Sequence, residues 1–190
     1  MDKIKVWDPF VRVFHWSLAA AVLINFLNEG GDTWHRWEGY VAVALVVSRI
    51  IWGFVGSKYA RFSEWFPTPN RLIPYVKGML QGEHPRYLGH NPAGAVMMLF
   101  LLTMVLGMGV TGFMMGTDAF WGEEWLEELH EIMAYTLLTG VGLHVLAALI
   151  ESRRHQENLP AAMIHGYKRL PDGAIELSQA QPALLKDTQN

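Results

Sequence analysis

Two histidines stand fourteen residues apart in a stretch that is otherwise almost entirely apolar. The segment 126–150 contains no Lys or Arg, yet it carries His130 and His144. In an α-helix, fourteen residues rise about 21 Å and bring the second side chain to within about 40° of the first. One helix would therefore present two imidazoles on one stripe, separated by most of the hydrocarbon thickness of a bilayer. Ionisable groups inside a membrane are costly, so both are candidates for function.

Two further histidines match this pair by depth. His15 follows the start of the first apolar block of the sequence, and His35 precedes the second. Because successive spans run in opposite directions, we expect His15 at the depth of His144 and His35 at the depth of His130. Taken singly, His35 could be a solvated surface residue, and His144 could hydrogen-bond a neighbouring helix. Two imidazoles from facing helices are the axial ligands of a b-type haem, so the two pairs predict two haem sites.

Two arginines accompany these histidines. Arg49 comes fourteen residues after His35, and Arg12 comes three residues before His15. At the depth of the His15 pair, either guanidinium could bind a haem propionate. For Arg49, a side chain that snorkels to the lipid headgroups is an equally good interpretation. No role is predicted for the other four histidines, which are His84, His90, His155 and His165. Of these, only His90 is expected in the first turn of a span.

The elements that must position these side chains are membrane spans. Of the 190 residues, 51% are hydrophobic and only 17% are charged. The apolar residues cluster in four blocks, each about long enough to cross a bilayer as a helix. The blocks are 11–28, 38–56, 94–116 and 126–151. We therefore predict an all-α integral membrane protein, a bundle of four transmembrane helices.

These spans and their connections fill one domain over 1–170, and a polar, poorly ordered tail is expected over 171–190. The first span lacks a convincing small-residue cleavage site, so we expect a retained helix rather than a signal peptide. The chain contains no cysteine. This excludes disulfides, thiolate metal sites, iron–sulfur clusters and the covalent attachment of a c-type haem.

Basic residues predict the orientation of the bundle in the cytoplasmic (inner) membrane of a bacterium. They gather before the first span, between the second and third, and after the fourth, while the other side has only Arg36. Both termini and the connection 57–93 are therefore expected in the cytoplasm. Within that connection, the amphipathic segment 66–80 predicts a helix lying in the interface. The acidic residues of the opposite side could be a solvated surface or a docking surface for a basic partner. They are Glu29, Asp32, Asp118, Glu123, Glu124, Glu127 and Glu128.

Several segments resemble the prokaryotic cytochrome b561 family, and within it the cytochrome b subunits of membrane-bound nickel–iron hydrogenases. The similar segments are DPFVRVFHW (8–16), HRWEGYVAVALVVSRIIWGFVGSKYARF (35–62), GHNP (89–92), HEIMAYTLLTGVGLHVLAALIES (130–152) and MIHGYKR (163–169). The resemblance implies four transmembrane helices that hold two b haems through His15, His35, His130 and His144. It also implies electron transfer between the quinone pool and a redox partner.

The sequence thus predicts a di-haem cytochrome b that connects quinone with a periplasmic redox protein, either a cytochrome c or a hydrogenase-like oxidoreductase. Its other partners are membrane lipid and, for a homodimer, a second copy of the chain; no nucleic acid is expected. One alternative is a quinone-coupled oxidase of a small oxidant such as superoxide, acting at the outer haem. Another is a transporter that uses the histidines as Zn²⁺ or Fe²⁺ ligands, although the spans lack the midplane carboxylates of a transport path.

Overall fold

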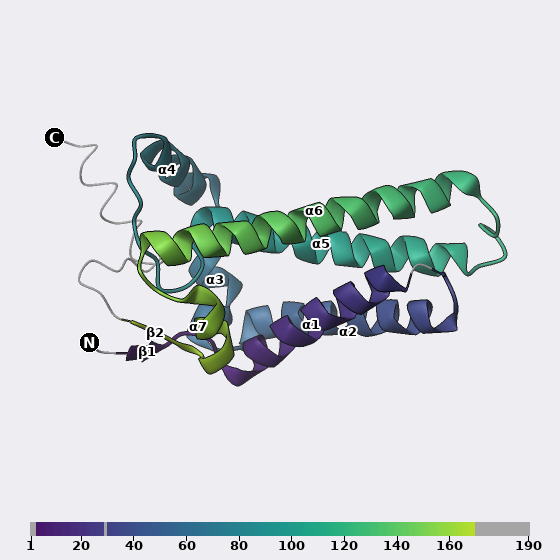
Figure 1. Ribbon diagram of the computed structural model, residues 1–190, viewed down its shortest axis with the longest axis horizontal. Coiled ribbons are helices and arrows are strands. Elements are labelled where there is room, and N and C mark those ends of the chain that lie inside the picture. Colours follow the sequence, from purple (N-terminus) through teal and green to yellow (C-terminus); the bar gives the residue numbers. More distant parts are fainter. Residues whose placement is uncertain (1–2, 29, 170–190) are drawn as a thin grey trace.

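Four long helices form an elongated bundle in the computed structural model, which describes residues 3–28 and 30–169 (Figure 1). They are α1 (Pro9–Leu27), α2 (Thr33–Val55), α5 (Pro92–Met115) and α6 (Glu124–Arg154). All four are long and apolar enough to cross a membrane. The expected set of four membrane-spanning helices is therefore present, and α6 extends past both ends of the predicted block. The tail expected over 171–190 lies outside the described residues.

Side-chain caps mark where α1 and α2 begin and hence the depth of the residues that follow. The Asp32 carboxylate accepts a hydrogen bond from the backbone N–H of His35 at 2.9 Å, which places this histidine in the first turn of α2. The Asp8 carboxylate caps α1 and also accepts from the side chains of Trp52 and Ser57. Burial raises the pKa of Asp8, but these hydrogen bonds outweigh it and lower the pKa overall.

The bundle is built from two helical hairpins. Helix α1 packs on α2, α5 packs on α6, and α2 packs on α5, whereas α6 does not pack closely on α1 or α2 within the described chain. The central core of the bundle consists of Phe14, Ala42, Val46, Leu102, Val105 and Leu137. Many apolar side chains on the outer surface are exposed, such as Phe54 and Ile132. An apolar outer surface over four long helices suits a lipid environment.

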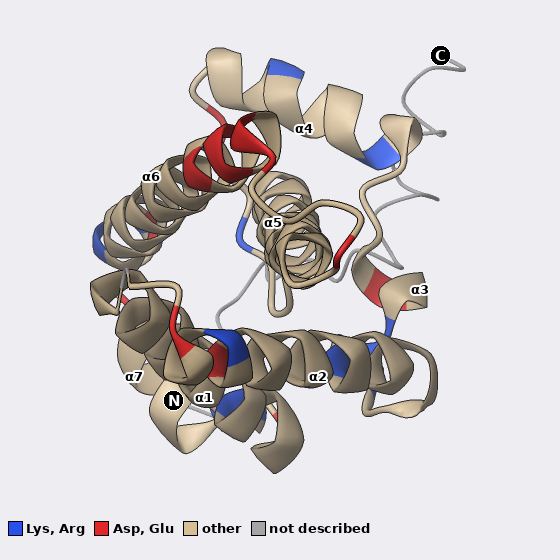
Figure 2. Cartoon of the chain, turned by 90° about the vertical axis from the view of Figure 1, so that its right-hand side faces the viewer, with Lys and Arg blue, Asp and Glu red and all other residues tan. Residues whose placement is uncertain are grey.

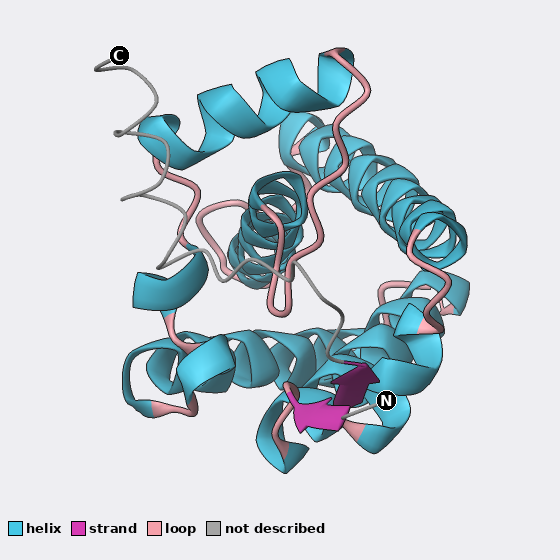
Figure 3. Ribbon diagram, turned by 90° about the vertical axis from the view of Figure 1, so that its left-hand side faces the viewer, coloured by secondary structure: helices cyan, strands magenta, loops and turns pink. Residues whose placement is uncertain are grey.

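Short elements cover the end of the bundle at which the described chain begins (Lys3) and stops (Arg169), here called the terminal end. Strands β1 (Lys3–Lys5) and β2 (Tyr167–Arg169) form a two-stranded antiparallel sheet there, shown in magenta in Figure 3. The 3₁₀ helix η1 (Lys58–Ala60) and helices α3 (Phe62–Trp65) and α4 (Pro69–Leu80) connect α2 to α5. Helix α7 (Leu159–His165) leads from α6 to β2. The opposite end, which holds the α1–α2 and α5–α6 connections, is called the loop end.

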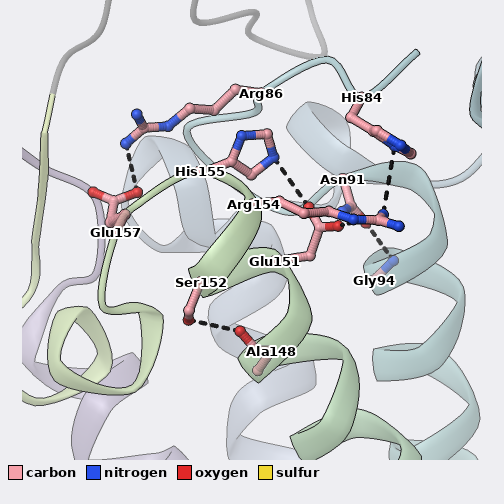
Figure 4. Close-up of polar contacts among 10 residues, drawn as sticks. All are labelled: His84, Arg86, Asn91, Gly94, Ala148, Glu151, Ser152, Arg154, His155 and Glu157. Carbon is pink, nitrogen blue, oxygen red and sulfur yellow. Dashed lines mark hydrogen bonds and ion pairs between the residues drawn. The ribbon is translucent and has the colours of Figure 1, made fainter. Parts of the chain in front are cut away.

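Polar contacts close the terminal end around the last turns of α6 (Figure 4). Arg86 forms a 2.6 Å ion pair with Glu157, whose other carboxylate oxygen accepts from the backbone N–H of Arg169. His155 lies 3.2 Å from Glu151, one turn before it on α6. These contacts fasten the 81–91 connection and β2 to the end of α6.

Candidate functional site

The structure brings together four histidines as two pairs, one at each end of the bundle. His15 on α1 and His144 on α6 have ring centroids 6.3 Å apart near the terminal end. His35 on α2 and His130 on α6 have ring centroids 6.2 Å apart near the loop end. Helix α6 contributes to both pairs, and the fourteen-residue spacing separates its two histidines by about 21 Å along the axis. Each pair thus joins the α5–α6 hairpin to the α1–α2 hairpin.

The loop-end pair is held by hydrogen bonds to one nitrogen of each ring. Nδ1 of His35 lies 2.7 Å from the carbonyl oxygen of Asn28. Nδ1 of His130 lies 2.7 Å from the hydroxyl oxygen of Thr111 on α5. In addition, the Asn25 amide on α1 donates to the carbonyl oxygen of His35 at 2.9 Å, which ties the first turn of α2 to α1. Both rings are therefore oriented through Nδ1, and their Nε2 atoms take no part in these contacts.

Several buried nitrogen atoms around the two pairs have no hydrogen-bond partner among the described residues. At the loop end this atom is Nε2 of His130. At the terminal end they are Nδ1 of His15, Nδ1 of His90, Nε of Arg12 and Nη1 of Arg49. Buried polar atoms in proteins are almost always satisfied, so such a group points to a ligand. Imidazole nitrogens can coordinate a metal, and guanidinium groups can bind carboxylates.

The separation within each pair fits two imidazoles on one iron. A metal lies about 2 Å from an imidazole nitrogen, and the ring centroid lies about 1.1 Å behind that nitrogen, so two opposed axial ligands place their centroids about 6 Å apart. The observed values are 6.3 Å and 6.2 Å. Two imidazoles complete the coordination of an iron that a macrocycle already holds, so each pair suits haem. No group of three or more metal-binding side chains is found in the described part of the chain.

Arg49 is enclosed rather than extended toward a surface. Its side chain is 1% exposed, and Nη2 donates to the carbonyl oxygen of Ala60 at 3.0 Å. The aromatic rings of Phe62 and Trp65 lie within 6.0 Å of its guanidinium carbon. No carboxylate forms an ion pair with it within the described residues, and Asp8 acts on its charge only at longer range. This burial argues against snorkelling and for an anionic ligand.

Arg12 has a second role that its position in the sequence did not reveal. Its Nη1 donates to the carbonyl oxygen of Ile164 at 2.6 Å, so it fastens α1 to α7. Gly166, two residues after Ile164, has a φ of +91° and leaves room for the Arg12 side chain. A Cβ at Gly166 would lie 3.4 Å from Nε of Arg12 and 2.6 Å from the Trp7 carbonyl oxygen. Nε of Arg12 is buried without a partner among the described residues and is left for a ligand.

Two residues near the pairs were missed or misplaced by sequence reasoning. Thr111 was overlooked because the third span contains no histidine. His90 precedes the cap of α5 instead of lying in its first turn, and its ring is 4.9 Å from that of Trp7 and 5.2 Å from that of Trp65. Desolvation lowers the pKa of His90 to about 3, so the ring is neutral at physiological pH. The resemblance in GHNP was the one signal for it.

The remaining histidines lie apart from the two pairs. Nη1 of Arg154 is 3.5 Å from Nδ1 of His84, and His155 contacts Glu151, as drawn in Figure 4. His165 ends α7 and accepts a hydrogen bond from the backbone N–H of Tyr167. Each of these residues has a structural contact at the terminal end.

Comparisons with known proteins agree with this arrangement. The family model described as prokaryotic cytochrome b561 matches residues 6–166. The chain is similar to proteins named probable Ni/Fe-hydrogenase B-type cytochrome subunit. It is 25% identical to that of Rhodobacter capsulatus, over 90% of this chain and 83% of the relative. It is 22% identical to that of Bradyrhizobium diazoefficiens, over 88% and 86%. No solved structure matches the chain significantly. The chain belongs to the prokaryotic cytochrome b561 family, the b-type cytochromes that carry electrons in membranes.

Proposed function

We propose that the chain is a di-haem cytochrome b that carries electrons across the bacterial cytoplasmic membrane between the quinone pool and a periplasmic redox partner. His15 and His144 would hold the inner haem, and His35 and His130 the outer haem. The observation that carries this proposal is the pair geometry: two imidazole pairs with nearly equal centroid separations stand at opposite ends of one bundle. Bound haem would supply reversible one-electron transfer at each pair.

The residues of the chain bind and orient each group. The histidine rings would supply the nitrogens that hold each haem, and the hydrogen bonds at Nδ1 of His35 and His130 keep those two rings from rotating. Near the inner pair, the buried guanidinium nitrogens of Arg49 and Arg12 that lack partners would bind the propionates. The apolar core between the helices would keep water away and so strengthen such ion pairs.

The charge distribution supports an orientation with both termini in the cytoplasm. The terminal end carries nearly all Lys and Arg residues of the chain, and positive charge favours the cytoplasmic side. Helix α4 crosses this end of the bundle, and it exposes apolar side chains that suit the membrane interface (Figure 1). These side chains are Ile73, Val76, Met79 and Leu80.

The loop end supports a cationic periplasmic partner. Acidic side chains gather on the first turns of α6, coloured red in Figure 2, and they are exposed. They include Glu123, Glu124, Glu127 and Glu128. The outer pair begins one turn further along the same helix, so a protein docked here would lie close to it. Complementary charge would speed the encounter with a basic cytochrome c or a hydrogenase-like oxidoreductase, the latter favoured by the names of the relatives. A homodimer is compatible with the exposed apolar flanks of the bundle.

The same acidic surface speaks against oxidation of superoxide at the outer haem. A negative surface repels a small anion, and Arg36 is the one basic residue predicted on that side of the membrane. The metal-ion transporter is disfavoured because the described residues lack a cluster of three or more metal-binding side chains.

Absorption spectra of the detergent-purified protein, oxidised and dithionite-reduced, test the proposal when combined with haem quantification as the pyridine adduct. We expect low-spin b-type spectra with two haems per chain. One haem per chain would refute one of the pairs, and the variants His35→Ala and His15→Ala would show which. Protein produced with ample haem but containing none would refute the proposal.

A further inference from the structure

We propose that Thr111 is a positioning residue for the outer haem: its hydroxyl fixes the tautomer of His130 and lowers the midpoint potential of that haem. This inference rests on the proposed ligation by His35 and His130. It assigns a role in electron transfer to α5, the one membrane span that contributes no histidine to either pair.

The hydroxyl proton of Thr111 is committed to the backbone of its own helix. Oγ1 lies 3.0 Å from the carbonyl oxygen of Gly107 and 3.1 Å from that of Met108, and both carbonyls can only accept. A hydroxyl has a single proton, which can go either to these carbonyls or to Nδ1 of His130, 2.7 Å away. We assign it to the carbonyls, because the alternative would put the proton of His130 on its buried Nε2, which has no acceptor among the described residues. Nδ1 of His130 then carries a proton and donates it to Thr111.

This assignment leaves Nε2 of His130 unprotonated and able to ligate iron. Nε2 is buried and has no hydrogen-bond partner among the described residues, so a proton there would lack an acceptor. His35 reaches the same state through a different acceptor. Its Nδ1 lies 2.7 Å from the carbonyl oxygen of Asn28, which cannot donate, so His35 also carries its proton on Nδ1. Both outer ligands are thus preset for coordination through Nε2.

The inner pair has no equivalent hydrogen bond. Nδ1 of His15 is the nitrogen left free for a ligand, and no hydrogen bond from a ring nitrogen of His15 or His144 to an oxygen atom is found among the described residues. An imidazole that donates its N–H to oxygen becomes a more basic ligand. A more basic ligand stabilises ferric iron relative to ferrous iron, and this lowers the potential. The hydrogen bond from His130 to Thr111 therefore acts on the outer haem alone.

The variant Thr111→Val tests this role, because valine has nearly the same shape but no hydroxyl. Thr111→Ser keeps the hydroxyl and is the conservative rescue. A matched control is Thr139→Val, which removes a hydroxyl bonded to the carbonyl oxygen of Tyr135 on the exposed side of α6, away from both pairs. Each variant is purified with haem, counted for haem per chain, and titrated by spectroelectrochemistry. His15→Ala, which keeps only the outer haem, assigns the two potentials.

We expect Thr111→Val to raise the outer potential and leave the inner one unchanged. Loss of a ligand's outer hydrogen bond commonly costs about tenfold in metal affinity. If the preference of the site for ferric over ferrous iron falls tenfold, the midpoint potential of the outer haem rises by about 59 mV for a one-electron couple. Thr111→Ser and Thr139→Val should titrate like the original protein.

Other outcomes separate the two proposals. Fewer than two haems in the original protein would contradict the proposed function itself. Two haems with an unshifted outer potential in Thr111→Val would overturn the role of Thr111. If Thr111→Val loses the outer haem, retention by Thr111→Ser supports the hydrogen bond. Loss from both variants would refute it, because serine preserves the hydroxyl.

Discussion

The substitution Arg49→Met should loosen the inner haem by about two orders of magnitude while leaving the folded bundle almost as stable as before. Arg49 is 1% exposed and lies between Phe62 and Trp65, with one hydrogen bond to the carbonyl oxygen of Ala60. Methionine fills a similar volume without a charge. The Ala60 carbonyl oxygen keeps the Nε1 donor of Trp65 at 3.3 Å, so it is not left unsatisfied.

The expected magnitudes follow from these contacts. Without haem, the variant loses a hydrogen bond from a charged donor, about 2 kcal/mol, and two cation–π contacts of about 1 kcal/mol each. It also removes the desolvation penalty of an unpaired buried charge, which is several kcal/mol. These terms nearly cancel. With haem bound, the variant additionally loses a buried ion pair with a propionate, about 3 kcal/mol, which corresponds to roughly a hundredfold weaker binding.

Haem transfer from the purified protein to excess apomyoglobin measures this loss. We expect the inner haem, half of the total, to leave the Arg49→Met protein about a hundredfold faster than it leaves the original protein. The transfer rate of the outer haem should stay unchanged and is an internal control. Arg49→Lys, which keeps the charge but not the planar guanidinium, should fall between the two. Equal rates for both halves would refute the pairing of Arg49 with a propionate. Apoprotein destabilised by well over 3 kcal/mol would show that Arg49 acts mainly on the fold.

Three further predictions concern other parts of the molecule. His130→Ala should halve the haem content determined as the pyridine adduct, because the two pairs share no residue; unchanged content would refute the pairing. Gly109→Ala should destabilise the protein by about 1–3 kcal/mol in detergent thermal unfolding, since its Cβ would lie 2.2 Å from Val43 Cγ2, whereas Gly142→Ala, with open space, should be neutral or slightly stabilising. Desolvation lowers the pKa of Lys168 from 10.5 to about 8, so the unfolded chain binds more protons above pH 8. Stability should therefore rise from pH 8 to 10 by at most about 1.4 kcal/mol per unit, and Lys168→Met should flatten that slope.

The spans and the histidine pairing could be predicted because both depend on local regularities. An apolar block of bilayer length gives a helix, and alternating directions give each histidine a depth. His15 and His144 are far apart in sequence, yet their depths suffice to place them together. Small residues in α5 let α6 approach closely, and a Cβ at Gly107 would lie 2.3 Å from Met133 Cε.

Other features could not be predicted because they depend on contacts between distant residues. Strands of three residues, such as Lys3–Lys5, carry no periodic pattern, and their pairing with Tyr167–Arg169 follows from the return of the chain to the terminal end. Thr111 looks like any small polar residue in a span until α6 places His130 beside it. The hydrogen bond from Arg12 to the carbonyl oxygen of Ile164 likewise depends on where α7 comes to lie.

Each histidine pair takes one member from α6, which is synthesised after the other three membrane helices of the described chain. Under the proposed ligation, a nascent chain that has inserted α1, α2 and α5 holds His15 and His35 but neither of their partners. Both haems must therefore be captured after translation of α6, and a chain truncated before Glu124 should retain neither. In cells starved of haem, the α1–α2 and α5–α6 hairpins would remain joined mainly through α2 and α5. Haem supply would then act as a checkpoint for assembly, with unfilled chains exposed to membrane proteases.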